Sequence, residues 1–497
     1  MNFINKDKFI DLDSISIDIE AIKAVPEKIA VENSIIAFKE EKENLYIAIS
    51  RDLEQSVIEE LNFITNKALK LFYADKYKIV NLINTYYCRY SAEKALKSMK
   101  KNNYDYIIKK KIESSAYGDS IQDVPIVKVV NYIINDALCK QASDIHIEPF
   151  ERYVLIRFRI DGIMQEFTKI PKDIYSLLNT RFKIMASMDI TEKKTPQDGK
   201  IQYSYNDENY DFRVSTLPTF FGEKIVIRIL HRSSKMNHLS VLGFKNEDID
   251  IIHSMIHSHC GIILVTGPTG SGKTTTLYSM INSLDKKKMN ITSIEDPVEY
   301  MIENVNQVNV NSKIGFDFPK GLRTILRQDP DVIMLGEIRD EETAKIAIRA
   351  AITGHLVIST LHTNGALESI SRLLDMGVKN YFIKDALIGV ISQRLVRKVC
   401  PLCKKAYYPS LSEREELKIR EEFKLYKGAG CSKCGNSGYN GRTIVYEMID
   451  FRNIKKSMDS NFNWYDFKDE FKSIDNDCRN LIKSGVTTYE EFLRLKF

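Results

Sequence analysis

The alternation of apolar and polar positions near the N-terminus predicts a small α/β domain. Apolar runs at residues 34–38 and 45–49 have the length of short strands, and residues 53–65 have helical spacing after a polar turn. No group of chemically reactive side chains stands out in this part of the chain. We therefore expect residues 1–95 to form one domain with a docking or regulatory role.

A second pattern of helix and strands follows. An amphipathic helix is predicted over residues 124–141, ahead of several strand-like segments. Asp161-Gly162 and Asp198-Gly199 lie between such segments and are good turn signals. These elements predict a second domain over residues 123–233. The predicted strands are residues 145–147, 154–160, 212–214 and 224–230.

Polar stretches separate the predicted domains. Residues 96–122 are Lys-rich and have the composition of a solvated linker. Residues 231–237 are typical of a hinge, so we begin the third domain at residue 238 and extend it to residue 497. Late in this domain, residues 441–448 have a strand pattern, and the segment after Trp464 is helical and charged, with a capped helix start at residues 486–491.

A strand, a glycine-rich loop and a helix open the third domain and predict a phosphate-binding site. The loop fits the P-loop pattern G-x-x-x-x-G-K-[ST] and is called the P-loop below. It lies between an apolar run at 262–265 and helical spacing at 274–284. In such loops the backbone N–H groups close around phosphate oxygens at a helix N-terminus. Lys273 would reach the β- and γ-phosphates, and the hydroxyl of Thr274 would bind Mg²⁺. The residues expected to hold the nucleotide are Gly267, Pro268, Thr269, Gly270, Ser271, Gly272, Lys273, Thr274 and Thr275.

Three further strands of this domain end in carboxylates or histidines, at residues 291–299, 331–337 and 356–362. Because ligands lie at the carboxyl ends of parallel strands, we expect these side chains to approach one nucleotide. Glu337 is the natural candidate to polarise an attacking water; the alternatives are a residue that holds Mg²⁺ through water, or a neighbour of a helix N-cap. His355 and His362 bracket the third strand, which favours function over the core role expected of a lone histidine.

The composition is that of a globular protein of several domains. The chain has 497 residues, of which 43% are hydrophobic and 28% charged, and a net charge of +5 from 72 basic and 67 acidic residues. So small an excess of positive charge argues against a nucleic-acid-binding protein, although it does not exclude a local basic face. No apolar run approaches the length of a membrane span, and the N-terminus lacks a signal-peptide core. We expect a cytoplasmic protein that reaches a membrane only through a partner.

Four of the eight cysteines form two C-x-x-C pairs. Pairs separated by a few tens of residues are the sequence form of a four-cysteine zinc site. Disulfides and a redox pair are the alternatives; the absence of a leader disfavours disulfides, and two successive pairs favour metal. Four thiolates leave no position for water, so the zinc would be structural. The predicted ligands are Cys400, Cys403, Cys431 and Cys434.

Taken together, these motifs resemble those of the secretion ATPases that drive type IV pilus assembly and type II secretion. The resemblance covers nearly the whole chain. Within this family, the chain looks like the pilus extension ATPases, the PilB type. The two C-x-x-C pairs complete the set. The matching segments are residues 142–149, 196–199, 213–219, 222–224, 295–299, 326–331, 336–340, 353–355 and 359–364, together with the P-loop.

The resemblance implies a RecA-like C-terminal ATPase domain, with a zinc module at residues 398–445, joined to a PAS-like second domain (N2) and a small first domain (N1). Such chains assemble as homo-hexamers with ATP, Mg²⁺ and Zn²⁺ bound, and the nucleotide lies between N2 and the ATPase domain. The implied function is hydrolysis of ATP to power pilin polymerisation. N1 would dock to an inner-membrane platform protein, alongside cytoplasmic accessory proteins, so that the protein is peripherally associated with the membrane through the pilus machine.

The resemblance also assigns roles that spacing alone leaves open. Arg213 and Arg228, which could otherwise be charges on a solvated strand face, would reach the phosphates like arginine fingers. Glu337 would act as catalytic base, and the two histidines would sense the γ-phosphate. The carboxylates expected to support Mg²⁺ and water are Glu295, Asp296 (directly or through water) and Glu299.

Other features limit these expectations. Some relatives bind cyclic-di-GMP through Arg-Leu-Gly and leucine-rich motifs near the N-terminus; that pattern is missing from this sequence, so we expect no such binding. Gly365 stands where relatives commonly have aspartate.

Retraction ATPases lack N1 and the cysteine pairs, which disfavours a retraction function for this chain. A type II secretion ATPase is the alternative within the family. A DNA-dependent RecA-like motor is disfavoured by the low charge and single Trp, and a non-hydrolysing scaffold by the intact P-loop and acid.

Overall fold

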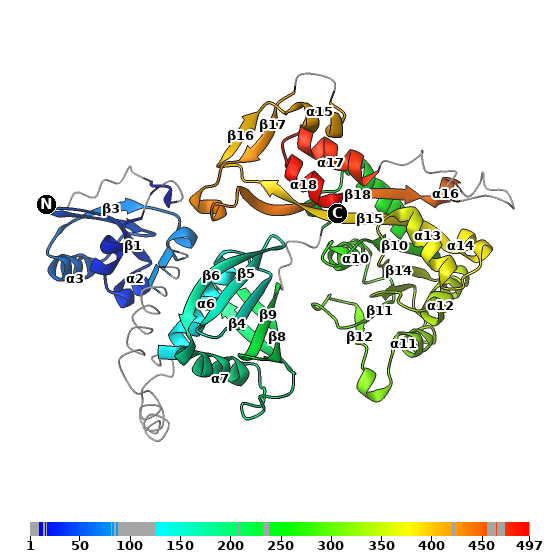
Figure 1. Ribbon diagram of the computed structural model, residues 1–497, viewed down its shortest axis with the longest axis horizontal. Coiled ribbons are helices and arrows are strands. Elements are labelled where there is room, and N and C mark those ends of the chain that lie inside the picture. Colours follow the sequence, from blue (N-terminus) through cyan, green and yellow to red (C-terminus); the bar gives the residue numbers. More distant parts are fainter. Residues whose placement is uncertain are drawn as a thin grey trace. The chain divides into compact units, whose positions relative to one another are not determined.

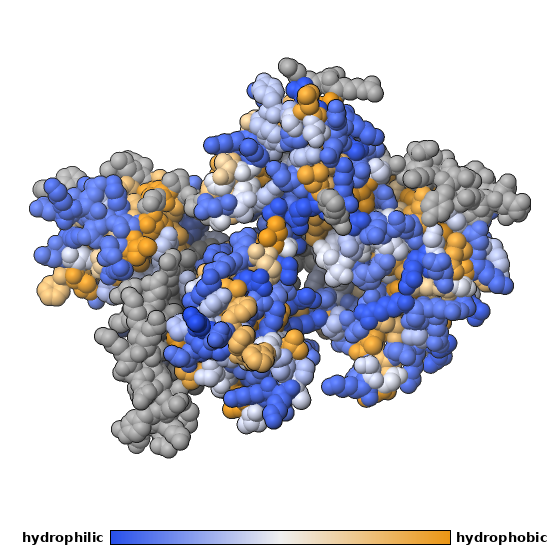
Figure 2. All heavy atoms as spheres, viewed as in Figure 1, coloured by the Kyte–Doolittle hydropathy of each residue, from blue (hydrophilic) through white to orange (hydrophobic). Residues whose placement is uncertain are grey.

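The computed structural model describes residues 9–12, 15, 17–80, 82–83, 86–87, 125–206, 208–231, 238–419, 423–454, 464 and 473–496 (Figure 1). The chain divides into two compact units, Met1–Arg232 and Ser233–Phe497. This boundary falls in the predicted hinge, whose residues 232–237 lie outside the described ranges, as does the predicted linker at 96–122. The surface seen in Figure 2 is mainly hydrophilic, with hydrophobic side chains in separate patches. Among the described residues, no helix is long and apolar enough to cross a membrane.

A three-stranded sheet with flanking helices forms the N-terminal part of the first unit. The strand order is β1-β2-β3, with β1 antiparallel and β3 parallel to β2. The core contains Ile35, Leu45 and Leu61, and the two strands and the helix predicted here are confirmed. The elements are α1 (Ile19–Ala24), α2 (Glu27–Asn33), β1 (Ile35–Glu41), β2 (Asn44–Ile49), α3 (Gln55–Thr65) and β3 (Ala68–Tyr73).

A six-stranded antiparallel sheet forms the rest of the first unit. The strand order is β6-β5-β4-β9-β8-β7. Helices α6 and α7 share one core with this sheet, in which Phe158, Phe182 and Phe212 are buried. The elements are α6 (Pro125–Cys139), β4 (Asp144–Pro149), β5 (Tyr153–Ile160), β6 (Ile163–Pro171), η3 (Lys172–Ile174), α7 (Tyr175–Met185), β7 (Gln197–Tyr205), β8 (Glu208–Thr219) and β9 (Gly222–His231).

The two turn signals in this sheet have different outcomes. Asp161 and Gly162 take positive φ values of 48° and 84° and join β5 to β6, as predicted. Asp198-Gly199 is not a turn, because both residues lie inside β7 and pair with β8. A Cβ on Gly199 would lie 2.3 Å from the carbonyl oxygen of Ala186. The glycine therefore allows close packing of strand and helix end, and the turn prediction is wrong at this position.

A seven-stranded sheet organises the second unit. The strand order is β12-β11-β13-β14-β10-β15-β18, and neighbours are parallel except β15 and β18. Ile262 and Leu264 of β10 belong to one buried cluster, and Ile263 and Val265 to another, so both faces of the sheet are covered. The elements up to the last parallel strand are α8 (Leu239–Leu242), α9 (Asn246–Ile256), β10 (Gly261–Thr266), α10 (Lys273–Asn282), β11 (Ile291–Glu295), β12 (Asn306–Asn309), η5 (Ser312–Ile314), α11 (Phe318–Ile325), β13 (Val332–Leu335), α12 (Glu341–Ile352), β14 (Leu356–Leu361), α13 (Ala366–Asp375), α14 (Asn380–Ala386) and β15 (Leu387–Val399).

The antiparallel pair β15 and β18 carries the cysteine-rich module at its far end (Figure 1). Helix α18 packs against this pair through a buried ion pair between Arg397 and Glu491. Thr488 caps α18 by accepting a hydrogen bond from the backbone of Glu491, which confirms the predicted capped start. The remaining elements are β16 (Lys404–Tyr407), α15 (Leu411–Leu417), β17 (Leu425–Gly428), η6 (Ser432–Cys434), β18 (Tyr439–Asp450), α16 (Phe451–Ile454), α17 (Ile474–Lys483) and α18 (Tyr489–Leu495).

Candidate functional site

The glycine-rich loop lies between β10 and α10, at the carboxyl end of a central strand. β10 is flanked by β14 and β15, and the helix begins at Lys273 directly after the loop. Gly267, Gly270 and Gly272 have positive φ values of 143°, 80° and 88°, which side-chain-bearing residues rarely adopt. The strand and helix predicted on either side of the loop are therefore confirmed.

Close packing and unused donors make this loop suitable for phosphate. A Cβ on Gly267 would lie 2.3 Å from the carbonyl oxygen of Gln393 and 2.6 Å from Oγ of Ser271. Gly272 supplies no side chain to cap α10, so the backbone donors at its start are not used by a cap. Oγ of Ser271 is buried and has no hydrogen-bond partner among the described residues. These features fit a bound phosphate group.

Lys273 is folded onto the loop. Its Nζ donates to the carbonyl oxygens of Gly267 and Pro268 at 2.9 and 3.0 Å, and the residue is only 8% exposed. Burial lowers the pKa of Lys273, and the negative charge of Glu337 opposes this shift. Phosphate oxygens would offer this ammonium group a charged and therefore stronger partner than two carbonyls. Thr274 lies exposed on the first turn of α10, where its hydroxyl is accessible to a cation.

Glu337 lies at the same edge of the sheet, just after β13. Its Oε1 accepts a hydrogen bond from Nη2 of Arg339 at 2.5 Å, and its Oε2 lies 3.4 Å from Nε2 of His362, which follows β14. Nη1 of Arg339 is also 3.5 Å from Oδ2 of Asp296, which follows β11. These four side chains form one charged group at the carboxyl ends of neighbouring strands, and Glu337 acts electrostatically on Lys273. Such a group can hold a cation and orient a water molecule.

Glu295 and Glu299 are placed differently from Asp296. Glu295 ends β11 and is only 3% exposed. Burial raises the pKa of Glu295, although its hydrogen bonds act in the opposite direction. Glu299 is half-buried, and its backbone N–H donates to the hydroxyl of Tyr278 at 3.2 Å. Of the three predicted carboxylates, only that of Asp296 joins the charged group. The side chains that donate to Glu295 are Ser293, Gln307 and Tyr278.

The two predicted histidines lie at opposite ends of β14. This strand runs parallel to β10, and Gly261 pairs with Leu356 at the end away from the P-loop. His355 precedes that pair, and its Nδ1 lies 3.1 Å from the carbonyl oxygen of Ala350. The six-residue strand puts seven steps of about 3.3 Å between it and His362, which separates the two histidines by about 23 Å. Within this chain, the structure brings His362 but not His355 to the loop.

Arg213 and Arg228 lie in the first unit, on the neighbouring strands β8 and β9. They are direct partners across the two strands, so their side chains share one face of the sheet. Nε of Arg228 lies 3.1 Å from Oδ1 of Asp144 on β4, and the Arg228 side chain remains 63% exposed. Arg159 approaches the same aspartate at 3.5 Å. Both predicted arginines thus belong to a charged face of the six-stranded sheet.

Two polar residues, Arg339 and Gln393, shape the edge of the seven-stranded sheet. Sequence patterns did not identify either of them. Arg339 bridges two carboxylates, yet a charge in a short turn is more often only solvated. Gln393 on β15 is 0% exposed, donates to the carbonyl oxygen of Ser271 and accepts from the hydroxyl of Thr276, both at 2.8 Å. The available signal for Gln393 is the polar run at 392–394, which follows an apolar run at 387–391.

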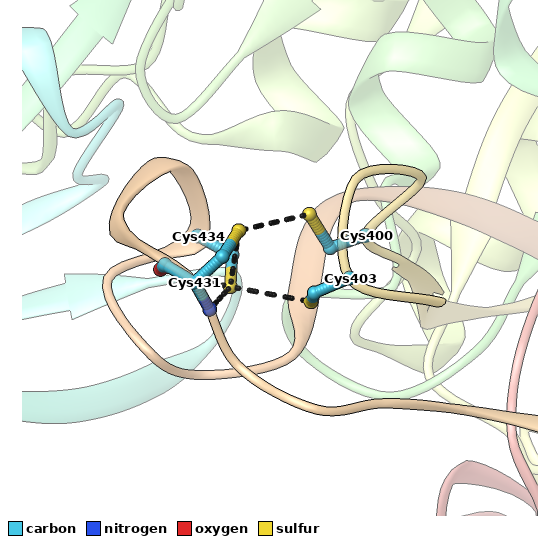
Figure 3. Close-up of side chains that lie close together, drawn as sticks. All are labelled: Cys400, Cys403, Cys431 and Cys434. Carbon is cyan, nitrogen blue, oxygen red and sulfur yellow. Dashed lines mark hydrogen bonds between the residues drawn. The ribbon is translucent and has the colours of Figure 1, made fainter. Parts of the chain in front are cut away.

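The four cysteines of the two C-x-x-C pairs converge from two loops (Figure 3). Their Sγ atoms all lie within 4.8 Å of one another, and Cys400–Cys431 and Cys403–Cys434 are each separated by 3.8 Å. A disulfide needs about 2.05 Å, whereas four sulfurs at about 2.3 Å from a tetrahedral zinc lie about 3.8 Å apart. Burial raises the pKa of Cys403 to about 12, whereas hydrogen bonds to the sulfur of Cys434, including that from the backbone of Gly438, outweigh burial and lower its pKa to about 6. The donor set therefore fits Zn²⁺.

Comparison with known proteins finds family matches over most of the chain. Residues 119–494 match the family described as type II/IV secretion system protein, and residues 8–92 match the MshEN domain. Type II secretion system protein E of Dickeya dadantii (strain 3937) is 44% identical over 382 residues, which cover 76% of this chain and 77% of the relative. The type IV pilus assembly ATPase PilB of Myxococcus xanthus (strain DK1622) is 40% identical over 456 residues, which cover 89% of this chain and 79% of the relative.

A solved structure extends the comparison to the fold. The pilus retraction motor PilT with bound ADP aligns with a TM-score of 0.50 and 29% identity over 73% of this chain and 95% of that chain. The predicted α/β fold with a RecA-like ATPase domain is thereby confirmed, and the chain is an ATPase. The chain belongs to the type II/IV secretion system protein family, in the group of ATPases that contains the type II secretion E proteins and PilB.

Proposed function

We propose that this ATPase is a hexameric motor that powers type IV pilus assembly from the cytoplasmic side of a membrane platform. The observation that carries this choice is the extent of the alignments. The match to PilB covers 89% of the chain, whereas the match to the type II secretion protein covers 76%. The longer match includes more of the chain outside the ATPase region. We expect a motor to make the contacts specific to its own machine through that part of the chain.

In this motor, the P-loop from Gly267 to Thr275 would bind the phosphates of ATP, with Lys273 at the β- and γ-phosphates. Thr274 and Asp296, the latter directly or through water, would hold Mg²⁺, which when bound neutralises phosphate charge. Glu337 would accept a proton from the attacking water, since its carboxylate lies at this edge between Arg339 and His362 and its charge acts on Lys273. Glu295 and Glu299, being buried or half-buried around Tyr278, would hold the Asp296 loop in place.

The histidine that we place near the γ-phosphate is His362, because it contacts Glu337 and follows the strand beside the P-loop. Arg213 and Arg228 of the second domain, residues 123–233, would provide positive charge to the phosphates when the domains close. Their common face and the exposure of Arg228 support this role. The first domain, residues 1–95, would dock to the platform protein.

The four cysteines would hold one structural Zn²⁺ within the module at residues 398–445 of the C-terminal domain, residues 238–497. Tetrahedral thiolate sites supply local folding energy and have no open position for chemistry. The module is carried by β15 and β18, and β15 also contacts the P-loop through Gln393. A bound metal would therefore stabilise one end of a strand whose middle supports the nucleotide site.

A type II secretion motor is the second candidate. It is supported by the higher identity, 44%, of the type II secretion relative. Both candidates share the same ATPase chemistry, so only the machine that contains the protein distinguishes them.

The test is deletion of the gene in its own organism, with complementation by the wild-type chain and by Lys273→Ala. Surface pili are counted by electron microscopy, and secreted proteins are profiled in the medium. We expect pili to disappear, secretion to persist, and only the wild-type chain to restore pili. Retention of pili with loss of secreted proteins would overturn the proposal in favour of the type II secretion motor.

A further inference from the structure

The strand β15 places three consecutive polar residues beside the nucleotide site. Ser392 pairs in register with Thr266, the last residue of β10 before the P-loop. Ser392 and Gln393 are both 0% exposed, although buried parallel strands are normally apolar. Uncharged polar side chains in such a position require hydrogen-bond partners, and these partners show what the segment does.

Gln393 uses both ends of its amide on the phosphate-binding loop and the helix that follows. Its Nε2 donates to the carbonyl oxygen of Ser271 at 2.8 Å, and its Oε1 accepts from the hydroxyl of Thr276 at 2.8 Å. Because a carbonyl oxygen only accepts, this partner fixes which end of the amide faces the loop. One side chain therefore connects the loop to the first turn of α10.

The same residue also limits the space around two loop glycines. A Cβ on Gly267 would lie 2.3 Å from the main-chain oxygen of Gln393, and a Cβ on Gly272 would lie 3.2 Å from its Nε2. The loop is thus held against β15 by hydrogen bonds and by close packing.

The residues on either side of Gln393 hold the loop that follows β14 and begins at His362. The hydroxyl of Ser392 donates to the carbonyl oxygen of Asn364 at 3.4 Å, and Nη2 of Arg394 donates to the same oxygen at 3.1 Å. This loop carries the histidine that contacts Glu337. Residues 392–394 thus join the two loops at this edge of the sheet.

We propose that Gln393 is a positioning residue that holds the P-loop in its phosphate-binding conformation before nucleotide arrives. It touches no phosphate itself and acts through Ser271 and Thr276. Preorganisation of this kind reduces the conformational cost of binding, so its loss weakens ground state and transition state equally. The expected signature is weaker binding of ADP and a higher KM for ATP, with kcat retained.

The test uses Gln393→Met, which keeps the side-chain length but removes the donor and the acceptor, in the full-length, zinc-loaded chain. We expect the Kd for ADP and the KM for ATP to rise at least tenfold, with kcat within threefold of the wild type. Gln393→Glu retains an acceptor for Thr276 but sets a carboxylate oxygen against the Ser271 carbonyl, and it should weaken ADP binding at least as much. The matched control is Leu387→Ala, which opens a cavity at the far end of the same strand.

Nucleotide affinity in folded variants decides whether Gln393 positions the P-loop. The rise in Tm on adding saturating ADP, compared with the same chain without ADP, separates binding from general destabilisation. We expect a smaller rise for both Gln393 variants and an unchanged rise for Leu387→Ala. The proposal is overturned if folded Gln393→Met binds ADP within twofold of the wild type, if kcat falls while KM is unchanged, or if Leu387→Ala loses ADP affinity to the same extent.

Discussion

Replacement of Gly267 by alanine introduces a single methyl group at the most crowded point of the P-loop. The added carbon would lie 2.3 Å from the carbonyl oxygen of Gln393 and 2.6 Å from Oγ of Ser271. The hydroxyl can rotate away, but the carbonyl oxygen belongs to a strand paired on both sides. The residue also has a φ of 143°, which alanine adopts only under strain. The loop must therefore move away from β15.

The magnitude follows from these two costs. Backbone strain at such a φ amounts to about 1–3 kcal/mol, and forcing an extra carbon into a packed site costs about 1–3 kcal/mol more. If the loop relieves this strain by leaving its phosphate-binding form, the whole amount opposes binding. Because 1.4 kcal/mol corresponds to a factor of ten, even the lower total of about 2 kcal/mol weakens nucleotide binding about 25-fold.

Titration of purified protein with a fluorescent ADP analogue measures this effect. Gly354→Ala is the matched control, because Gly354 has a φ of 111° but a Cβ added there would meet no atom of the described residues within 4 Å. It lies before His355, at the far end of β14 from the P-loop. We expect Gly267→Ala to lose ADP affinity and Gly354→Ala to retain it despite a lower Tm. Affinity within threefold of the wild type for Gly267→Ala would show that the added methyl group does not displace the loop from its phosphate-binding form.

Three further results are expected. Metal analysis should find about one zinc per chain, and chelation should expose the four thiols while ADP still binds; a stoichiometry near zero would reject the site. Glu491 is 2% exposed, and although burial raises its pKa, hydrogen bonds from Arg397 lower it overall. Its contribution to stability is therefore full above its ordinary pKa of about 4.3 and lost as pH falls through the lower folded value, so Tm should fall below about pH 4.3 by less in Glu491→Gln than in the wild type. Arg228→Ala should lower ATP turnover at least tenfold with ADP affinity within threefold, and unchanged turnover would contradict the arginine assignment.

The position of the nucleotide site follows from local sequence patterns. The P-loop pattern between an apolar run and a helical run places the loop at a strand's carboxyl end, and parallel pairing brings Glu337 to the same edge. The two histidines could have been separated in advance, because a six-residue strand puts its ends at opposite edges of the sheet. Because His355 and His362 are close in sequence, they were expected at one site, although the length of β14 separates them.

Other details depend on contacts between distant segments. Glu295 and Asp296 are adjacent in sequence, yet Tyr278 and Gln307 bury the first carboxylate and leave the second exposed. Gln393 acquires its role only when β15 pairs with β10, a pairing across more than a hundred residues that no local pattern predicts. Asp198-Gly199 has turn composition, but packing against the end of α7 makes it part of a strand.

We infer that ATP held by the P-loop is hydrolysed with Glu337 as proton acceptor. The direct measurement compares ATP binding and turnover by the purified Glu337→Gln chain with those of the wild type. Glutamine keeps the size of the side chain and can still accept a hydrogen bond from Arg339, but it cannot take a proton at neutral pH. We predict that this variant binds ATP with wild-type affinity and hydrolyses it at least a hundredfold more slowly. Turnover at the wild-type rate would show that Glu337 is not the proton acceptor.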